Sequence, residues 1–223
     1  MSVVLLVRHG QASWGAADYD VLSPLGGEQA QLLGRELAVR GLRPDVVLHG
    51  SLQRQRETAR LLAEAAGWQR THAVDAGWDE MDHLQVLART PRQQAGEQQT
   101  RAEFQAWFEA ATDRWTGGEF DEEYDESFAR FGERVATALR EVGAGLAADG
   151  VAVVVTSGGP VARVAAELLA PGPASTAVYR RLAPVVVNAS VTKLVLGRRG
   201  TTLVSLNEHA HLERAGSRLV TYR

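Results

Sequence analysis

The sequence predicts an α/β fold of three layers, in which a mostly parallel sheet is flanked by helices. Short apolar runs alternate along the chain with longer segments of helical periodicity, the pattern of strands that alternate with crossover helices. The runs at residues 3–7 and 151–155 are apolar at every position, as in core strands. The chain has 223 residues and is 45% hydrophobic, so it can build one sizeable core.

The first third of the chain supplies two pairs of a strand and a helix. Residues 3–7 form the first strand, and a helix follows from a Ser-Pro start signal at residues 23–24 to about Gly41. Residues 45–49 form the next strand, and the next helix covers residues 52–66 before a glycine.

The segment at about residues 84–124 departs from this alternation. It is polar and rich in Gln and Glu, yet it carries many large rings, which predicts a helical, aromatic-rich insertion folded over the sheet. The rings either line a pocket over the active site or pack the insertion onto the body of the protein. They are Phe104, Trp107, Phe108, Trp115, Phe120 and Tyr124.

The last part of the chain returns to the alternating pattern. Apolar residues spaced by three and four predict a long amphipathic helix over residues 128–146, followed by the strand at 151–155. Three further runs, at 185–188, 190–196 and 201–206, read as strands. No linker or repeat interrupts the chain, so we expect a single domain over residues 1–223.

Composition limits the classes of partner. A formal net charge of −3 predicts neither nucleic-acid nor anionic-membrane binding, so an anion site must be a local cluster. The chain has no cysteine, which excludes disulfides and thiolate chemistry. The first apolar run is too short for a secretory signal or a membrane span, and a cytoplasmic protein is the expectation.

Two segments carry residues suited to anion binding. The first strand ends in Arg8-His9-Gly10, which places a cation and an imidazole where a strand emerges at the sheet edge. Arg54 falls at the predicted start of the helix after the second strand, where unpaired backbone N–H groups already attract anions. Arg8 and Arg54 are therefore candidates for a phosphate clamp, although a surface Arg-His pair is the alternative.

These segments resemble the histidine phosphatase superfamily, in its phosphoglycerate mutase-like branch. The resemblance rests on Leu6-Val7-Arg8-His9-Gly10, on Leu22-Ser23-Pro24-Leu25-Gly26 and on Ser51-Leu52-Gln53-Arg54, in that order. It extends to Asn188-Ala189-Ser190 and Asn207-Glu208-His209 near the end. It implies a histidine-phosphatase-like domain without a metal or cofactor, acting on a small phosphorylated substrate.

The resemblance also implies roles for single residues. His9 corresponds to the histidine that is phosphorylated during turnover, and Arg8 and Arg54 correspond to the arginines that hold the phosphoryl group. Glu80 best matches the acidic proton donor, beside the apolar Trp78 and Met81, with Asp82 in reserve.

The chain departs from the family pattern at the strand of residues 151–155. Where the family usually has a second histidine followed by glycine, this chain has Ser157 and Gly158. A serine hydroxyl donates one hydrogen bond but carries no positive charge, and the backbone N–H groups of the turn would bind the anion in part. His211 or His209, near the end of the chain, is the alternative source of an imidazole.

The sequence therefore predicts a metal-independent phosphomonoesterase, histidine acid phosphatase-like, that works through a phosphohistidine on His9. A phosphoglycerate mutase-type transfer is one alternative. Mutase-like members typically continue with Glu-Ser-x-Trp-Asn after the nucleophile loop, whereas this chain has Gln11-Ala12-Ser13-Trp14-Gly15 and so lacks the asparagine amide. A binding module for phosphorylated ligands, weakened as a catalyst by Ser157, is the other. A serine hydrolase is disfavoured because Ser157 lacks the Gly-x-Ser-x-Gly elbow, and no spacing matches a standard metal site.

Overall fold

The computed structural model describes residues 1–13, 20–69, 72–91 and 101–222. These residues contain a six-stranded sheet in the order β3-β2-β4-β1-β5-β6. The strands are β1 Ser2–Arg8, β2 Val46–His49, β3 His72–Val74, β4 Val151–Thr156, β5 Val191–Gly197 and β6 Gly200–Glu208.

The strand directions bring the carboxyl ends of β1, β2, β3 and β4 to the same edge of the sheet. β1 and β2 both run parallel to β4, and β3 runs parallel to β2, whereas β5 is antiparallel to β1 and forms a hairpin with β6. Arg8 at the end of β1 pairs with Thr156 at the end of β4. The carboxyl ends of these strands therefore lie side by side, at the edge where α/β sheets bind ligands.

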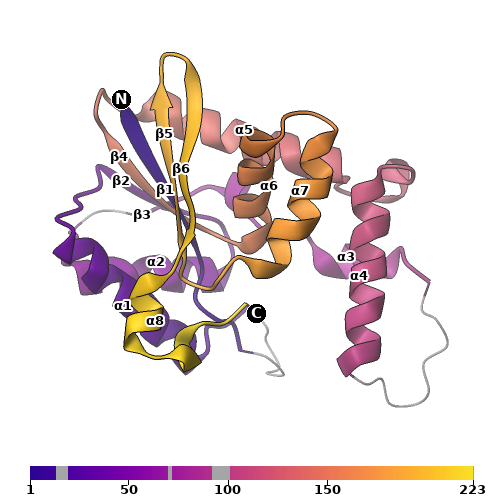
Figure 1. Ribbon diagram of the computed structural model, residues 1–223, viewed down its shortest axis with the longest axis horizontal. Coiled ribbons are helices and arrows are strands. Elements are labelled where there is room, and N and C mark those ends of the chain that lie inside the picture. The colour runs from indigo at the N-terminus through magenta and orange to yellow at the C-terminus, as the bar shows by residue number, and fades with distance from the viewer. Residues whose placement is uncertain (14–19, 70–71, 92–100, 223) are drawn as a thin grey trace. The chain divides into compact units, whose positions relative to one another are not determined.

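Helices α1 (Pro24–Val39) and α2 (Gln53–Ala66) pack on one face of this sheet (Figure 1). The Ser23 side chain accepts the Gly26 N–H and Pro24 occupies the first turn of α1, as the Ser-Pro signal predicts. Gly67 ends α2 with a left-handed φ of 69°. The core between helices and sheet includes Leu5, Val7, Leu33, Leu37, Val47, Leu62, Val153 and Val155.

The opposite face is covered by α6 (Gly158–Leu169), which contacts β1 and β6, with α7 (Ala174–Leu182) against α6 (Figure 1). Successive strand residues point to opposite faces, so Leu6 and Val154 belong to this second core, and both are fully buried. α8 (Ala210–Ala215) contacts α1. The predicted α/β class, a mostly parallel sheet flanked by helices, is confirmed.

Residues Met81–Arg134 form a compact unit, separate in its contacts from the unit of Met1–Glu80 and Val135–Arg223. It contains α3 (His83–Ala88), α4 (Arg101–Gly117) and the start of α5 (Phe128–Gly145), and the predicted insertion at about 84–124 lies within it. Its core is aromatic: Trp115 is fully buried, with ring centroids 5.1 Å from Phe128 and 5.5 Å from Phe131. Some of the predicted rings therefore pack the unit itself.

One predicted strand is wrong. Residues 185–188 form no strand: a short 3-10 turn, Ala183–Val185, is followed by irregular chain. The apolar run suggested a strand, but its backbone groups have other partners. The Val187 N–H donates to the Asn207 side chain, and the Asn188 N–H donates to the Thr221 carbonyl. Patterning missed β3, α7 and α8, because each is too short to show a clear period.

Candidate active site

The candidate site begins where β1 ends at the carboxyl edge of the sheet. The His9 N–H continues the ladder by donating to the Thr156 carbonyl at 2.8 Å. Gly10 follows because no side chain fits there: an ideal Cβ would lie 2.3 Å from the Gly26 carbonyl oxygen. The Gly10 N–H donates to the Thr58 hydroxyl of α2 at 3.0 Å. The imidazole is therefore mounted on backbone that is anchored to the sheet and to α2.

Both ring nitrogens of His9 have defined partners, and the ring is only 6% exposed. Nδ1 lies 2.7 Å from the Gly10 carbonyl oxygen, which only accepts, so Nδ1 carries the proton. Nε2 accepts from the Arg54 Nε–H at 3.1 Å. Burial, with the charges of Arg54 and Arg8, holds the pKa of His9 well below its usual value. The ring is therefore neutral, with its lone pair on Nε2.

Arg54 lies in the first turn of α2 and is nearly buried. Its Nη1 donates to Asp20 Oδ1 at 2.8 Å, while the backbone N–H of Gln53 donates to Asp20 Oδ2 at 2.7 Å. The Asp20 carboxylate thus caps α2 and fixes the guanidinium so that Nε faces His9. Sequence reasoning missed Asp20, since nothing in the local pattern indicates a contact across 34 residues.

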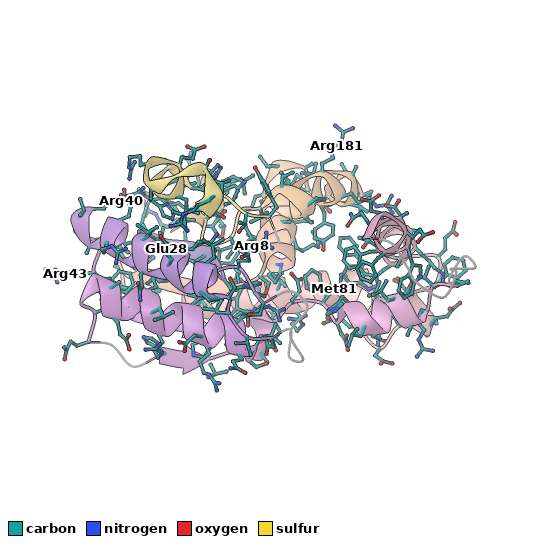
Figure 2. The ribbon with its side chains drawn as sticks, turned by 90° about the horizontal axis from the view of Figure 1, so that it is seen from below. Arg8, Glu28, Arg40, Arg43, Met81 and Arg181 are labelled. Carbon is teal, nitrogen blue, oxygen red and sulfur yellow. The ribbon has the colours of Figure 1, made fainter. Side chains whose placement is uncertain are left out.

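Arg8, which Figure 2 labels, is the last residue of β1. Its Nη1 donates to the Val186 carbonyl. An ideal Cβ on Gly158 would lie 3.5 Å from Arg8 Nε, so the guanidinium packs directly on the first turn of the helix. Two guanidiniums, one of them paired with the Asp20 carboxylate, therefore accompany one neutral imidazole, which is an arrangement that attracts anions.

Ser157 ends β4 and begins α6, and it is fully buried. Its hydroxyl oxygen accepts from Gln55 Nε2 at 2.9 Å. The other Gln55 Nε2 hydrogen reaches the Trp78 carbonyl at 3.1 Å, and the Thr156 hydroxyl donates to the same carbonyl at 2.6 Å. Gln55 was also missed from the sequence, although it stands next to Arg54. It holds the segment before Glu80 against the end of β4.

Glu80 is placed at the start of α6 by a short polar contact. Its Oε2 accepts the Gly159 N–H at 2.9 Å, and an ideal Cβ on Gly159 would lie 2.0 Å from Oε1. Only glycine at 159 leaves room for the carboxylate there. Burial raises the pKa of Tyr179 on α7 above its usual value, and Glu80 raises this pKa further when it is ionised, so the phenol stays neutral. Arg8 and Glu80 are thus placed at the same helix terminus.

A family model described as the histidine phosphatase superfamily, branch 1, matches residues 4–209. The chain belongs to this superfamily. A mycobacterial glucosyl-3-phosphoglycerate phosphatase has a similar structure, with a TM-score of 0.65, 25% identity and coverage of 93% of this chain and 99% of that one. A phosphoserine phosphatase from Entamoeba histolytica shares the fold, with a TM-score of 0.68, 18% identity and coverage of 95% and 100%.

Curated relatives match over shorter stretches. A 2,3-bisphosphoglycerate-dependent phosphoglycerate mutase of Thermobifida fusca is 45% identical over 74 residues, which are 30% of this chain and 30% of that protein. One from Chelativorans is 33% identical over 87 residues, 36% of this chain and 42% of that protein. This chain therefore matches less than half the length of each of these relatives. The predicted family is confirmed.

Three further predicted residues have other surroundings or partners in the described structure. Ser13 donates its backbone N–H to the Val21 carbonyl at 2.7 Å. Asp82 is exposed, belongs to the unit of Met81–Arg134 and accepts the Leu84 N–H as the cap of α3. His211 is buried on α8, and no hydrogen bond joins it to Arg8, His9 or Arg54 in the described structure.

Two absences apply to the described ranges only. No group of three or more His, Cys, Asp or Glu side chains there is arranged to hold a metal ion. Within the same ranges, no helix has both the length and the apolar character needed to cross a membrane.

Proposed function

We propose that this protein hydrolyses phosphate monoesters through a phosphohistidine formed on Nε2 of His9. The observation that carries the proposal is the hydrogen-bonding of the ring: the proton on Nδ1 is committed to the Gly10 carbonyl, and the lone pair on Nε2 faces the Arg54 guanidinium. A phosphoryl group bound by Arg54 would place its phosphorus at that lone pair.

In the first step, the lone pair of His9 Nε2 forms the N–P bond while the ester P–O bond breaks. Arg54 and Arg8 neutralise the charge on the phosphoryl oxygens. Glu80, positioned at Gly159, gives its proton to the departing oxygen. Two guanidiniums supply the positive charge, so the proposed reaction needs no metal.

In the second step, a water oxygen attacks the phosphorus of phosphohistidine. The Glu80 carboxylate takes a proton from this water, the N–P bond breaks, and its electron pair returns to Nε2 as inorganic phosphate leaves. Glu80 ends the cycle protonated, as it began. Ser157 stands where the family usually has a second histidine, so the proposal assigns the phosphate's charge to Arg8 and Arg54 alone.

The comparisons support a small phosphate monoester as the substrate. The Entamoeba phosphatase was crystallised with phosphoserine, and the mycobacterial phosphatase was crystallised with VO3. Both are named as phosphatases, and both are covered almost completely by this chain.

The test is hydrolysis of p-nitrophenyl phosphate by the purified protein with and without a chelator. We expect turnover that survives chelation, loss of turnover in His9→Ala, and an acid-labile phosphoenzyme in the unmodified protein only. His72→Ala is the control, because His72 is a half-buried histidine of β3 outside the site. An active His9→Ala protein, or a phosphoenzyme that survives acid, would contradict the proposal.

Phosphoglycerate mutase activity is the second candidate, favoured by the curated mutase relatives. Interconversion of 2- and 3-phosphoglycerate faster than hydrolysis of either would establish it. Phosphate binding without turnover of any ester would instead indicate a binding module, the outcome that a serine at position 157 makes chemically reasonable.

A further inference from the structure

We infer that Thr221, in the C-terminal tail, is a positioning residue that fixes the nucleophile loop at residues 9–11. It acts through two fully buried amide side chains, Asn188 and Gln29. The inference rests on the proposed function of His9, because it concerns where that imidazole stands. It assigns a role in catalysis to the end of the chain, which touches no reacting atom.

The first arm of the network runs through Asn188. Its Nδ2 donates to the His9 carbonyl oxygen at 3.0 Å, and its Oδ1 accepts the Thr221 hydroxyl at 2.9 Å. The Asn188 backbone N–H donates to the Thr221 carbonyl at 2.9 Å. The peptide that follows the nucleophile is thus tied to the tail by one side chain.

The second arm runs through Gln29 of α1. Its Oε1 accepts the Gln11 N–H at 2.8 Å. Its Nε2 donates to the Leu219 carbonyl at 2.8 Å and to the Thr221 hydroxyl oxygen at 2.9 Å. The two arms therefore hydrogen-bond to both ends of residues 9–11, at the His9 carbonyl and the Gln11 N–H, and both contact the hydroxyl group of Thr221.

The hydroxyl of Thr221 also sets which way round the Asn188 amide lies. An amide has a donor end and an acceptor end, and a carbonyl oxygen such as that of His9 only accepts. Because the Thr221 hydroxyl gives its hydrogen to Oδ1, the Nδ2 end must face His9. Without that hydroxyl, the buried Oδ1 loses its donor, and the amide can shift toward another donor and weaken its contact to the His9 carbonyl.

The backbone beside Asn188 is built to hold this contact. Ala189 has a φ of 56°, in the left-handed region that alanine rarely adopts. Its N–H is directed at the Arg8 carbonyl at 3.0 Å and the His9 carbonyl at 3.3 Å. A strained conformation persists only where its surroundings impose it, so this segment is docked firmly on the end of β1.

A small displacement of His9 is enough to affect chemistry. Nε2 attack needs alignment with phosphorus, and a shift of about 1 Å can cost on the order of 100-fold in rate. The guanidiniums of the substrate-binding arginines have partners other than Thr221, Asn188 and Gln29, since Arg54 donates to Asp20 and Arg8 donates to the Val186 carbonyl. Loss of the Thr221 hydroxyl should therefore lower kcat while leaving KM nearly unchanged.

The test is the isosteric Thr221→Val, with Thr221→Ser as the variant that restores the hydroxyl. Thr202→Val is the matched control, an exposed threonine of β6 outside the network. With p-nitrophenyl phosphate we expect kcat to fall roughly 10- to 100-fold in Thr221→Val, KM and vanadate inhibition to stay within about twofold, and Thr221→Ser to recover.

Three results would overturn the inference: kcat of Thr221→Val within about twofold of the parent, a Thr221→Ser protein as slow as Thr221→Val, or KM rising in proportion to the loss. A readout without turnover separates this inference from the proposed function. If the parent hydrolyses no ester, the proposed function fails, yet the NMR resonances of the His9 ring still decide the positioning. They should move in Thr221→Val and not in Thr202→Val.

Discussion

Replacing Gly159 by alanine should expel Glu80 from its place at the start of α6. The added Cβ would lie 2.0 Å from Glu80 Oε1 and 2.9 Å from its Cδ, whereas a Cβ essentially never comes within 3.0 Å of a non-bonded heavy atom in proteins. The carboxylate is the flexible partner, so it must move by about 1 Å or more while α6 stays in place. Alanine also favours the helix over glycine.

The expected loss in the phosphorylation rate is on the order of 100-fold, because general acid catalysis contributes about 10²- to 10⁴-fold and depends on the distance to the leaving oxygen. The assay is single-turnover phosphorylation with two esters. p-Nitrophenolate leaves without needing a proton, but phenolate needs one, so Gly159→Ala should slow phenyl phosphate far more than p-nitrophenyl phosphate.

Two neighbouring substitutions make this prediction specific. In Gly158→Ala the new Cβ would lie 3.5 Å from Arg8 Nε, an ordinary contact, so its loss should be much smaller. Gly27→Ala adds a methyl to α1, 3.5 Å from a Leu61 methyl and outside the site, and should behave like the parent. The reasoning is refuted if Gly159→Ala slows both esters equally, or if Gly158→Ala is as slow as Gly159→Ala.

Two further predictions concern protonation. Arg54→Gln should raise the pKa of His9, because it removes a cation beside Nε2. The pKa of His9 should still stay below 6.5, because burial is the largest cause of its lowering and persists in the variant. Titration of the imidazole C2 proton by NMR measures the pKa, and Arg56→Gln, at an exposed position, is the control. Burial lowers the pKa of His211 from 6.5 to about 4. Between pH 6.5 and pH 4 the unfolded chain therefore binds a proton that the folded protein does not, so the free energy of unfolding falls as the pH falls. His211→Gln should therefore remove up to about 3 kcal/mol of acid sensitivity in urea unfolding compared near pH 7 and near pH 4; equal acid sensitivity of parent and variant would contradict the assignment.

Local sequence was sufficient to predict the class of fold and to place Arg54 near His9. A fully apolar run followed by Arg8-His9-Gly10 marks a buried strand that ends at a sheet edge, and the helix of Arg54 follows a second strand. Strand and helix periods are properties of neighbouring residues, and parallel strands bring their carboxyl ends to one edge. Arg54 and His9 were therefore predicted to lie near each other, and they are hydrogen-bonded.

The same local logic was misled at residues 185–188. Three consecutive valines favour a strand, but the segment's backbone pairs with the Asn207 side chain and with Thr221, and Ala189 takes a left-handed conformation directly after it. No propensity carries that information, because the competing partners come from other parts of the chain.

What the sequence determined by itself is therefore the alternation of strands and helices and the chemical identity of the groups at the sheet edge. Only the tertiary structure decided which atoms of those groups are committed: Nδ1 of His9 to Gly10, Arg54 to Asp20, Ser157 to Gln55, and the His9 carbonyl to Asn188. Hydrogen bonds are directional and short, so they depend on the positions of segments distant in sequence to within a fraction of an ångström. Local residue types and spacings do not indicate those positions.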